Sequence, residues 1–424
     1  MRWDHLRLDG SPEDSPGDVF GAGQDPGEGA GQPGGDQPGA QPGAQLGALF
    51  SRGAVTRTFD TPGFRGMTFY EIQAKSIVNR VPATSRMAFG WTINPYRGCQ
   101  HACHYCFARN THTYLDLDAG QDFNSKVVVK VNAPERLRKT LASARWAGEH
   151  IAMGTNVDCY QRAEGKYQLM RGIVAALRDY ANPFSILTKG TLILRDLDLL
   201  TQAAEVTDVG LNVSVGFVDK ELWRSLEPGT PSPERRLDVC RTLNGAGLRC
   251  GVLMGPVVPF LSDSPAQLEA AVRRIAATGA VHLTPIVLHL RPGTRDWYLR
   301  WLSEHHPALL PRYRSLYRHS AYAPKDYQAE ITGQVRELAR RYGVGAATPA
   351  GARSLEASPS MGPIPRADAP GSPGQRGSPG QRGSPGQPGS PGQRGRPGSP
   401  RRASPPGGPA QDPAQGGPQQ LSLL

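Results

Sequence analysis

The chain has 424 residues, a formal net charge of +11 and 38% hydrophobic residues. No run approaches the roughly 20 apolar residues that cross a bilayer, and the first residues lack the apolar stretch of a secretory signal. We therefore expect a cytoplasmic protein without membrane association, whose six cysteines stay reduced.

Both ends of the chain have a biased composition. Residues 1–48 are rich in Gly, Pro, Gln and Asp and hold two basic and eight acidic residues, and residues 350–424 are richer still in Pro, Gly and Ser. Neither end has enough large apolar side chains to offset the entropy of ordering, so we expect both to be disordered. Residues 371–400 are ten Gly-X-Y triplets, which we interpret as low-complexity sequence rather than a collagen helix.

Between these ends the sequence predicts an α/β domain. Residues 49–88 form a lead-in segment, with β-favouring stretches at 56–59 and 67–72. From residue 89, strand and helix signals alternate. Predicted strands lie at 89–94, 126–131, 150–154, 184–189, 209–215, 248–255 and 281–288, and predicted helices lie near 133–145, 166–180, 195–204, 233–246 and 265–278. This alternation predicts a parallel sheet, curled into a full or partial barrel core over residues 89–292.

After residue 293 the spacing becomes helical, and we assign residues 293–349 to a helical C-terminal extension. Basic and aromatic residues interleave at 312–322. Such a mixture can stack on bases and contact phosphates, but it is more often the amphipathic outside of a packed helix. The positive charge of the core is compatible with a nucleic-acid partner, although no dense basic run marks a binding stripe.

The loop after the first predicted barrel strand holds three cysteines, Cys99, Cys103 and Cys106, in the spacing C-x3-C-x2-C. A structural zinc site uses four protein ligands, whereas a cubane iron–sulfur cluster uses one ligand per iron. Three thiolates would therefore leave one iron open to another ligand. A zinc site completed by His101 or His104 is the alternative interpretation.

Polar residues gather where the predicted strands end: Asn94, Asn156, Asp158, Lys189, Ser214 and His289. In α/β barrels the carboxyl ends of the strands form the rim of the active site. Because the cysteine loop also follows a strand, we expect the metal and these polar side chains at the same rim.

At the cysteine motif the chain resembles the radical S-adenosylmethionine (radical SAM) superfamily. Downstream it is similar to the spore photoproduct lyase-like branch, through residues 185–189, 212–214, 226–230 with Arg235 and Arg236, and 246–256. The resemblance implies a partial (βα)6 radical SAM barrel. It also implies an enzyme that uses a [4Fe-4S] cluster on Cys99, Cys103 and Cys106 to cleave S-adenosyl-L-methionine. The resulting 5′-deoxyadenosyl radical would take hydrogen from a substrate, and an electron donor such as flavodoxin or ferredoxin would be needed.

The resemblance also implies roles for polar residues at the strand ends. Lys189 and Ser214 would contact the carboxylate or ribose of S-adenosylmethionine, and Asn156 and Asp158 would line the pocket. A lysine supplies a point charge for a carboxylate, and hydroxyl and amide groups suit ribose hydroxyls. The alternative for Lys189 is a solvated lysine at a strand end.

One residue departs from the family pattern. The lyase uses a cysteine near the third strand end to return hydrogen to its product, and Gly154 stands at the matching place in this chain. Cys159 is the remaining catalytic candidate, although a buried, inert cysteine is its default interpretation. The match therefore does not set the substrate. The competing function is a non-catalytic zinc or iron–sulfur module that binds nucleic acid.

Overall fold

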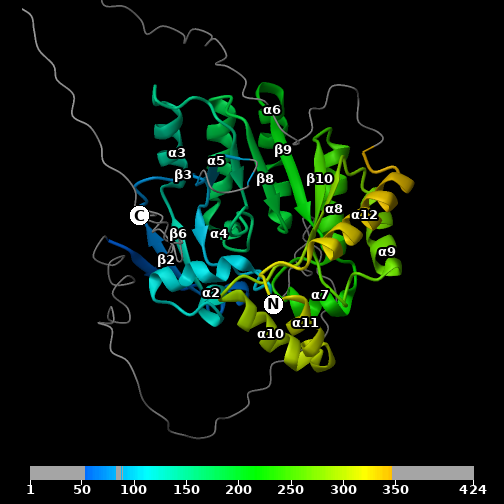
Figure 1. The fold of residues 1–424 in the computed structure, drawn as a ribbon. Coiled ribbons are helices and arrows are strands. Elements are labelled where there is room, and N and C mark those ends of the chain that lie inside the picture. The colour runs from blue at the N-terminus through cyan, green and yellow to red at the C-terminus, as the bar shows by residue number, and fades with distance from the viewer. Residues whose placement is uncertain (1–52, 83–86, 88, 346–424) are drawn as a thin grey trace, which may run out of the picture. The chain divides into compact units, whose positions relative to one another are not determined.

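The computed structural model describes residues 53–82, 87 and 89–345, and the ends for which we predict disorder lie outside these residues. Its main sheet has seven strands. In pairing order they are β11 (Leu283–Val287), β10 (Cys250–Val257), β9 (Val209–Ser214), β8 (Phe184–Thr188), β7 (Ile151–Met153), β4 (Trp91–Ile93) and β3 (Val78–Arg80). All are parallel except β3, which pairs antiparallel with β4. Six parallel strands alternating with helices confirm the predicted partial (βα)6 barrel (Figure 1).

One predicted barrel strand belongs to a different sheet. Residues 126–131 do form a strand, β6 (Lys126–Lys130), but it lies in a four-stranded sheet with β1 (Val55–Arg57), β2 (Thr68–Ile72) and β5 (Tyr96–Arg97). Its placement in the barrel was wrong because β6 pairs in parallel with β2, which sets buried Phe69 beside buried Val127. A short apolar run shows that a strand forms, but it does not show which strand becomes its partner.

Helices follow most of the strands along the chain. They are α2 (Gln121–Ser125), α3 (Ala133–Leu141), α4 (Glu164–Tyr167), α5 (Leu169–Asp179), α6 (Leu197–Val206), α7 (Lys220–Leu226), α8 (Pro233–Gly245), α9 (Pro265–Ala276), α10 (Thr294–His305), α11 (Leu310–Leu316) and α12 (Lys325–Arg341), with 3₁₀ turns η2 (Pro62–Phe64), η3 (Phe107–Leu115), η4 (Thr191–Asp196) and η5 (Pro307–Leu309). Ser232 and Ser264 cap α8 and α9 by accepting a backbone hydrogen bond, each directly before a proline. Within the described residues, none of these helices combines the length and apolar character needed to cross a membrane.

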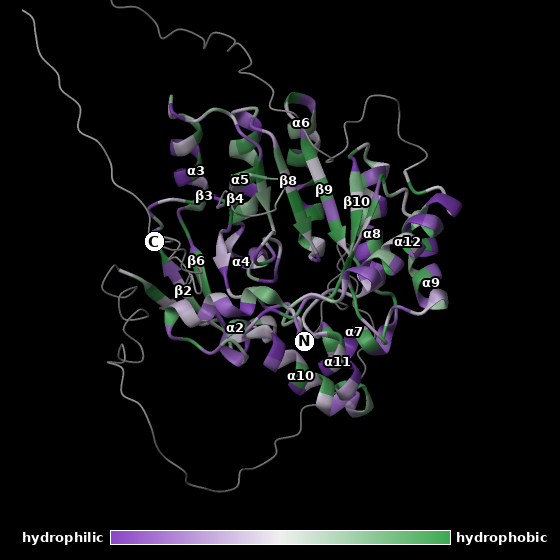
Figure 2. Cartoon of the chain, in the orientation of Figure 1, coloured by the Kyte–Doolittle hydropathy of each residue, from purple (hydrophilic) through white to green (hydrophobic). Residues whose placement is uncertain are grey.

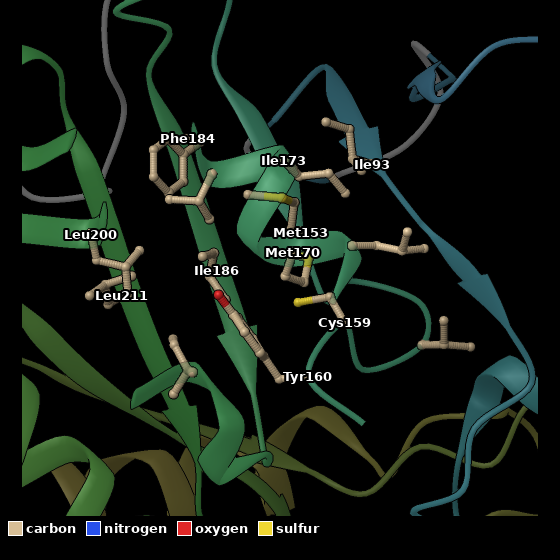
Figure 3. Packing of buried hydrophobic residues seen from close by; sticks show 14 of the residues in the cluster. Ile93, Met153, Cys159, Tyr160, Met170, Ile173, Phe184, Ile186, Leu200 and Leu211 are labelled. Atoms are coloured by element: carbon tan, nitrogen blue, oxygen red, sulfur yellow. The ribbon is translucent and has the colours of Figure 1, made fainter. Parts of the chain in front are cut away.

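The hydrophobic core lies between the main sheet and its helices. Figure 3 shows strand residues Ile93, Met153, Ile186 and Leu211 packed with helix residues such as Met170, Ile173 and Leu200, and all of these side chains are buried. Figure 2 shows that hydrophobic residues concentrate on strands such as β8, whereas the peripheral helices have mixed hydrophilic and hydrophobic sides. A second buried cluster joins β10 and β11 to α9, α10, α11 and α12.

The other face of the main sheet has a different composition. Side chains alternate between the two faces of a strand, so the residues between those of the core point away from the helices. On β8, β9 and β10 this face holds two leucines, Leu187 and Leu253, among small or polar residues: Ser185, Gly210, Asn212, Ser214, Gly251 and Gly255. Closed α/β barrels usually fill this interior with bulky branched side chains. Here most of the inner-face residues of these three strands are smaller or more polar than that pattern.

The loop after α7 packs directly on residues 99–106, which we call the cysteine loop. The Gly229 N–H donates to the His101 carbonyl at 3.1 Å, and the His104 N–H donates to the Leu226 carbonyl at 3.0 Å. A Cβ atom on Gly229 would lie 2.0 Å from the carbonyl oxygen of Gln100. Only glycine allows the two backbones to approach this closely.

Gly229→Ala should therefore lower the free energy of unfolding by about 1–3 kcal/mol, since the added methyl group forces the two loops apart. Gly245→Ala is the matched control, because a Cβ there meets nothing within 4 Å and the residue ends helix α8. That control should keep or slightly raise the stability. Urea unfolding of both variants measures the difference, and equal stabilities would contradict the proposed contact.

Candidate active site

A glycine that the backbone geometry requires, Gly98, directly precedes the cysteine loop. Gly98 has a φ of +87°, and a Cβ there would lie 2.6 Å from the carbonyl oxygen of Lys126. The loop therefore presses against the start of β6, and the Cys99 N–H donates to the Phe123 carbonyl at 3.0 Å. These contacts fix where the three cysteines lie.

The three thiols of this loop are free and largely buried. Cys99 and Cys103 are buried and Cys106 is half-buried, and none of them forms a disulfide. Burial raises the pKa of all three thiols, that of Cys103 to about 12. Such thiols become thiolates at neutral pH only when a metal supplies compensating positive charge.

The surroundings of the loop fit a polar group bound beside the thiols. Within the cysteine loop, four buried side-chain atoms have no hydrogen-bond partner: both polar atoms of the Gln100 side chain, Nε2 of His101 and Nδ1 of His104. In the part of the chain that the structure describes, no three His, Cys, Asp or Glu side chains are grouped as a single metal ion requires. A cubane cluster binds each thiolate to a different iron, so its ligands need not converge on one point.

Lys189 and Ser214, predicted to share a site, lie in contact. The Lys189 Nζ donates to the Ser214 Oγ at 2.8 Å, and the Ser214 hydroxyl donates to the Gly255 carbonyl at 2.9 Å. The same ammonium lies 5.7 Å from the ring centre of Tyr105, within the cysteine loop. Among the described residues no carboxylate lies within 4 Å of this ammonium. The arrangement therefore offers a positive charge beside the thiols to an anionic ligand.

Asp158 is occupied by contacts within the protein. It accepts hydrogen bonds from the Thr188 hydroxyl and the Lys189 N–H, both at 2.6 Å, and from the Tyr160 N–H at 2.9 Å. It also lies 3.4 Å from the His101 Nδ1. Burial lowers the pKa of His101 to about 4, so this contact joins a carboxylate to a neutral imidazole. These contacts give Asp158 a bracing role, and its predicted contact with the cofactor stays a prediction.

Asn156 lies half-buried in the same loop after β7 as Asp158. The structure thus brings all four predicted cofactor-binding residues, Asn156, Asp158, Lys189 and Ser214, to the carboxyl ends of adjacent strands β7, β8 and β9.

The sequence did not reveal a buried ion pair that supports this region. Glu227 and Arg236 are both fully buried and form a salt bridge of 2.6 Å. Glu227 also accepts a hydrogen bond from the Tyr105 hydroxyl, and Arg236 donates to the Ser214 carbonyl at 2.9 Å. Burial opposes the ionisation of Glu227, but Arg236 and Lys189 hold its pKa below the usual value. Both residues fall in the segments that support the family resemblance, yet only the structure shows their contacts.

The structure places Cys159 in the core. It is fully buried, and Figure 3 shows its sulfur among Met153, Met170 and Tyr160. Burial raises the pKa of this thiol well above its usual value. Cys240 and Cys250 are also fully buried, as expected of core cysteines.

Gly154 cannot be replaced by a cysteine in this backbone. Its φ is +75°, and a Cβ there would lie 1.8 Å from the Leu187 carbonyl oxygen. The position that matches the cysteine of the lyase is therefore closed to any side chain.

Comparisons with known proteins agree with this geometry. The family model described as "Radical SAM superfamily" matches residues 93–271. An uncharacterized protein of Mycobacterium tuberculosis is 46% identical over 291 residues, which cover 69% of this chain and 86% of that protein. An uncharacterized protein of Methanocaldococcus jannaschii is 32% identical over 195 residues, covering 46% of this chain and 69% of that protein.

Among solved structures, a single-residue variant of spore photoproduct lyase has a similar fold. Its TM-score is 0.50 at 16% identity, and the match covers 65% of this chain and 80% of that one. The structural match concerns the fold, while the family model and the relatives concern the sequence. Together with the cysteine loop at the carboxyl edge of a partial barrel, they show that this chain belongs to the radical SAM superfamily.

Proposed function

We propose that Cys99, Cys103 and Cys106 hold a [4Fe-4S] cluster and that the protein cleaves S-adenosylmethionine to abstract hydrogen from a substrate. One observation supports the proposal most directly. Three free thiols lie in a loop whose Tyr105 ring is 5.7 Å from the Lys189 ammonium. A thiolate site and a cation for a carboxylate thus meet at the rim where α/β barrels place their chemistry.

Several residues would bind S-adenosylmethionine or hold its binding residues in place. Lys189 would bind the carboxylate of S-adenosylmethionine, and Ser214 would hold the lysine in place through its 2.8 Å contact. The Tyr105 hydroxyl donates a hydrogen bond to the Glu227 carboxylate, and this bond fixes the position of the Tyr105 ring. When bound, the cluster supplies the electron that breaks the bond between the sulfonium and the 5′-carbon, which yields the 5′-deoxyadenosyl radical.

The proposed reaction also needs an electron donor such as flavodoxin or ferredoxin. We place the reaction in the cytoplasm, where reducing conditions keep thiols free. All six cysteines of the chain are free in the structure.

Protein reconstituted with iron and sulfide without oxygen should hold a cubane cluster and release 5′-deoxyadenosine from S-adenosylmethionine. Cys103→Ala should abolish both properties, whereas Cys240→Ala, a buried cysteine outside the loop, should keep both. Iron and sulfide analysis with chromatography of the nucleoside measures the outcome. One zinc per chain without 5′-deoxyadenosine would favour the non-catalytic module instead.

Lys189→Ala should keep the cluster but weaken the binding of S-adenosylmethionine, because the carboxylate loses its counter-charge. A charge-assisted contact is worth about 1.5–3 kcal/mol, which is roughly a ten- to hundredfold rise in Kd. Lys139→Ala, in an exposed residue of α3, is the control. Equilibrium binding to cluster-loaded protein measures the effect, and equal affinities for both variants would place Lys189 outside the site.

A cluster of aromatic side chains beside the site supports nucleic acid as the substrate class. The His289 ring stacks on Tyr322 at 5.4 Å and lies 5.8 Å from Phe107, which directly follows Cys106. The Arg291 guanidinium lies 5.4 Å from the centre of the Phe107 ring and donates to the Tyr322 hydroxyl at 3.2 Å. Tyr322 is 48% exposed. An exposed ring beside an arginine is what proteins use to stack an unpaired base.

The interleaved residues at 312–318 contribute less to this proposal than their sequence suggested. Tyr313 and Tyr317 are buried, and their hydroxyls donate to the carbonyls of Pro259 and Leu288 at 2.6 and 2.7 Å. This stretch is the amphipathic outside of a packed helix, the more frequent of the two interpretations.

Tyr322→Ala should weaken the binding of single-stranded DNA or RNA by about 1–3 kcal/mol, the usual value for one stacked base. Tyr180→Ala is the matched control, because Tyr180 is another exposed tyrosine at the end of α5, 43% accessible. Fluorescence anisotropy on cluster-loaded protein with S-adenosylmethionine, at low salt, gives the affinities. No binding to either nucleic acid, or equal losses in both variants, would contradict the proposal.

A further inference from the structure

Two arginines among the described residues are fully buried, and they differ in their partners. Arg236 has the carboxylate of Glu227 at 2.6 Å. Arg109 has no carboxylate within 4 Å in the part of the chain that the structure describes. A buried charge is costly unless an opposite charge accompanies it. Arg109, three residues after Cys106, lacks such a partner. We therefore expect a negatively charged group to bind beside its guanidinium.

The contacts of Arg109 are all with neutral groups. Its guanidinium donates to the carbonyls of Ala102 (3.1 Å), Cys103 (3.0 and 3.1 Å), Ala119 (3.1 Å) and Gly120 (2.9 Å), and to the Asn124 Oδ1 (2.9 Å). These bonds satisfy its donors and tie the cysteine loop to residues 119–124. They do not neutralise its charge.

Two aromatic rings complete the enclosure of the guanidinium. Its carbon lies 4.8 Å from the ring centre of Trp297 on α10 and 5.1 Å from that of Phe123. The rings exclude water, and the attraction of a cation to their faces offsets only part of its desolvation. Water therefore cannot screen this charge from its neighbours.

The negative groups that act on Arg109 are the three cysteines, once they are thiolates, and Asp118. Burial lowers the pKa of Arg109. Cys106, Cys103 and Cys99 act against this effect when they are thiolates, and Asp118 opposes it less than they do. Cys103 is also the residue whose carbonyl accepts two of the guanidinium's hydrogen bonds. The charge of the arginine thus lies beside the ligands of the proposed cluster.

We propose that Arg109 is the fixed counter-charge of the iron–sulfur cluster, a positioning residue that holds the Cys103 backbone and favours the reduced cluster. The inference rests on the proposed function. When the cluster accepts one electron from its donor, the negative charge beside Arg109 grows by one and no proton needs to follow. A nearby, unscreened cation stabilises that reduced state more than the oxidised state.

Three variants test this inference on the full-length protein reconstituted without oxygen. Arg109→Gln removes the positive charge but keeps hydrogen-bond donors. Arg109→Lys keeps the positive charge but loses the planar guanidinium group that can donate several hydrogen bonds at once. Arg312→Gln is the control, since Arg312 also lies over an aromatic ring, 3.7 Å from the centre of Phe260, but is exposed on α11. Iron and sulfide content and a redox titration followed by electron paramagnetic resonance are the two readouts.

Arg109→Gln should lower the equilibrium constant for cluster reduction at least tenfold, which is a midpoint potential about 59 mV lower. Arg109→Lys and Arg312→Gln should stay closer to the wild-type potential. If Arg109→Gln does not fold, the potential of Arg109→Lys decides, because only a counter-charge role predicts that it stays near the wild-type value.

Two results would overturn the inference. A wild-type potential in Arg109→Gln would show that the charge has no effect on the cluster. The second result is that Arg109→Gln and Arg109→Lys both fold but behave alike, either losing the cluster or shifting its potential equally. Arg109 would then act only through the geometry of the loop. A wild-type protein that takes up no cluster would instead overturn the proposed function, so the two failures are distinguishable.

Discussion

The hydrogen bonds of Asp158 join the parts on which the site depends. Its carboxylate accepts from the Thr188 hydroxyl and the Lys189 backbone, at the end of β8, and lies 3.4 Å from His101 in the cysteine loop. One side chain from the loop after β7 therefore sets the distance between the thiols and the proposed cofactor-binding lysine. Its geometry is tightly fixed, because the group is nearly buried and its partners come from both the end of β8 and the cysteine loop.

The charges around this carboxylate form a consistent pattern. Glu227 and Arg236 neutralise each other, whereas Lys189 and Arg109 have no carboxylate within ion-pairing distance among the described residues. Both unpaired cations lie beside the cysteine loop, one over the Tyr105 ring and one on the Cys103 carbonyl. A buried or half-buried cation is stable when a ligand brings the missing negative charge. This charge pattern agrees with the two anionic groups that we propose, the carboxylate of the cofactor and the cluster.

The sequence predicted those features that depend on spacing and periodicity. The three cysteines, the parallel strands and the shared location of Lys189 and Ser214 follow from short motifs and from strand ends that meet at one edge, whereas the hydrogen bond between these two residues was not predicted. It could not place β6, because pairing with β2 depends on a partner far away in the chain. The sequence also could not identify Arg109 as a functional residue, because the sequence alone does not tell whether an arginine after a cysteine motif is solvated or buried. Only burial and the absence of a carboxylate distinguish the two cases.

The strand pairing of the main sheet ends at β11 on one side and at the antiparallel β3 on the other. The barrel is therefore unclosed, and its inner face includes small and polar residues such as Ser185, Gly210 and Asn212. A closed barrel admits a molecule only through its mouth, whereas an open one also admits a segment of a long polymer whose two ends remain outside. For the nucleic-acid substrate proposed above, an unclosed barrel would therefore limit the width of the segment that reaches the strand ends and not the length of the whole polymer.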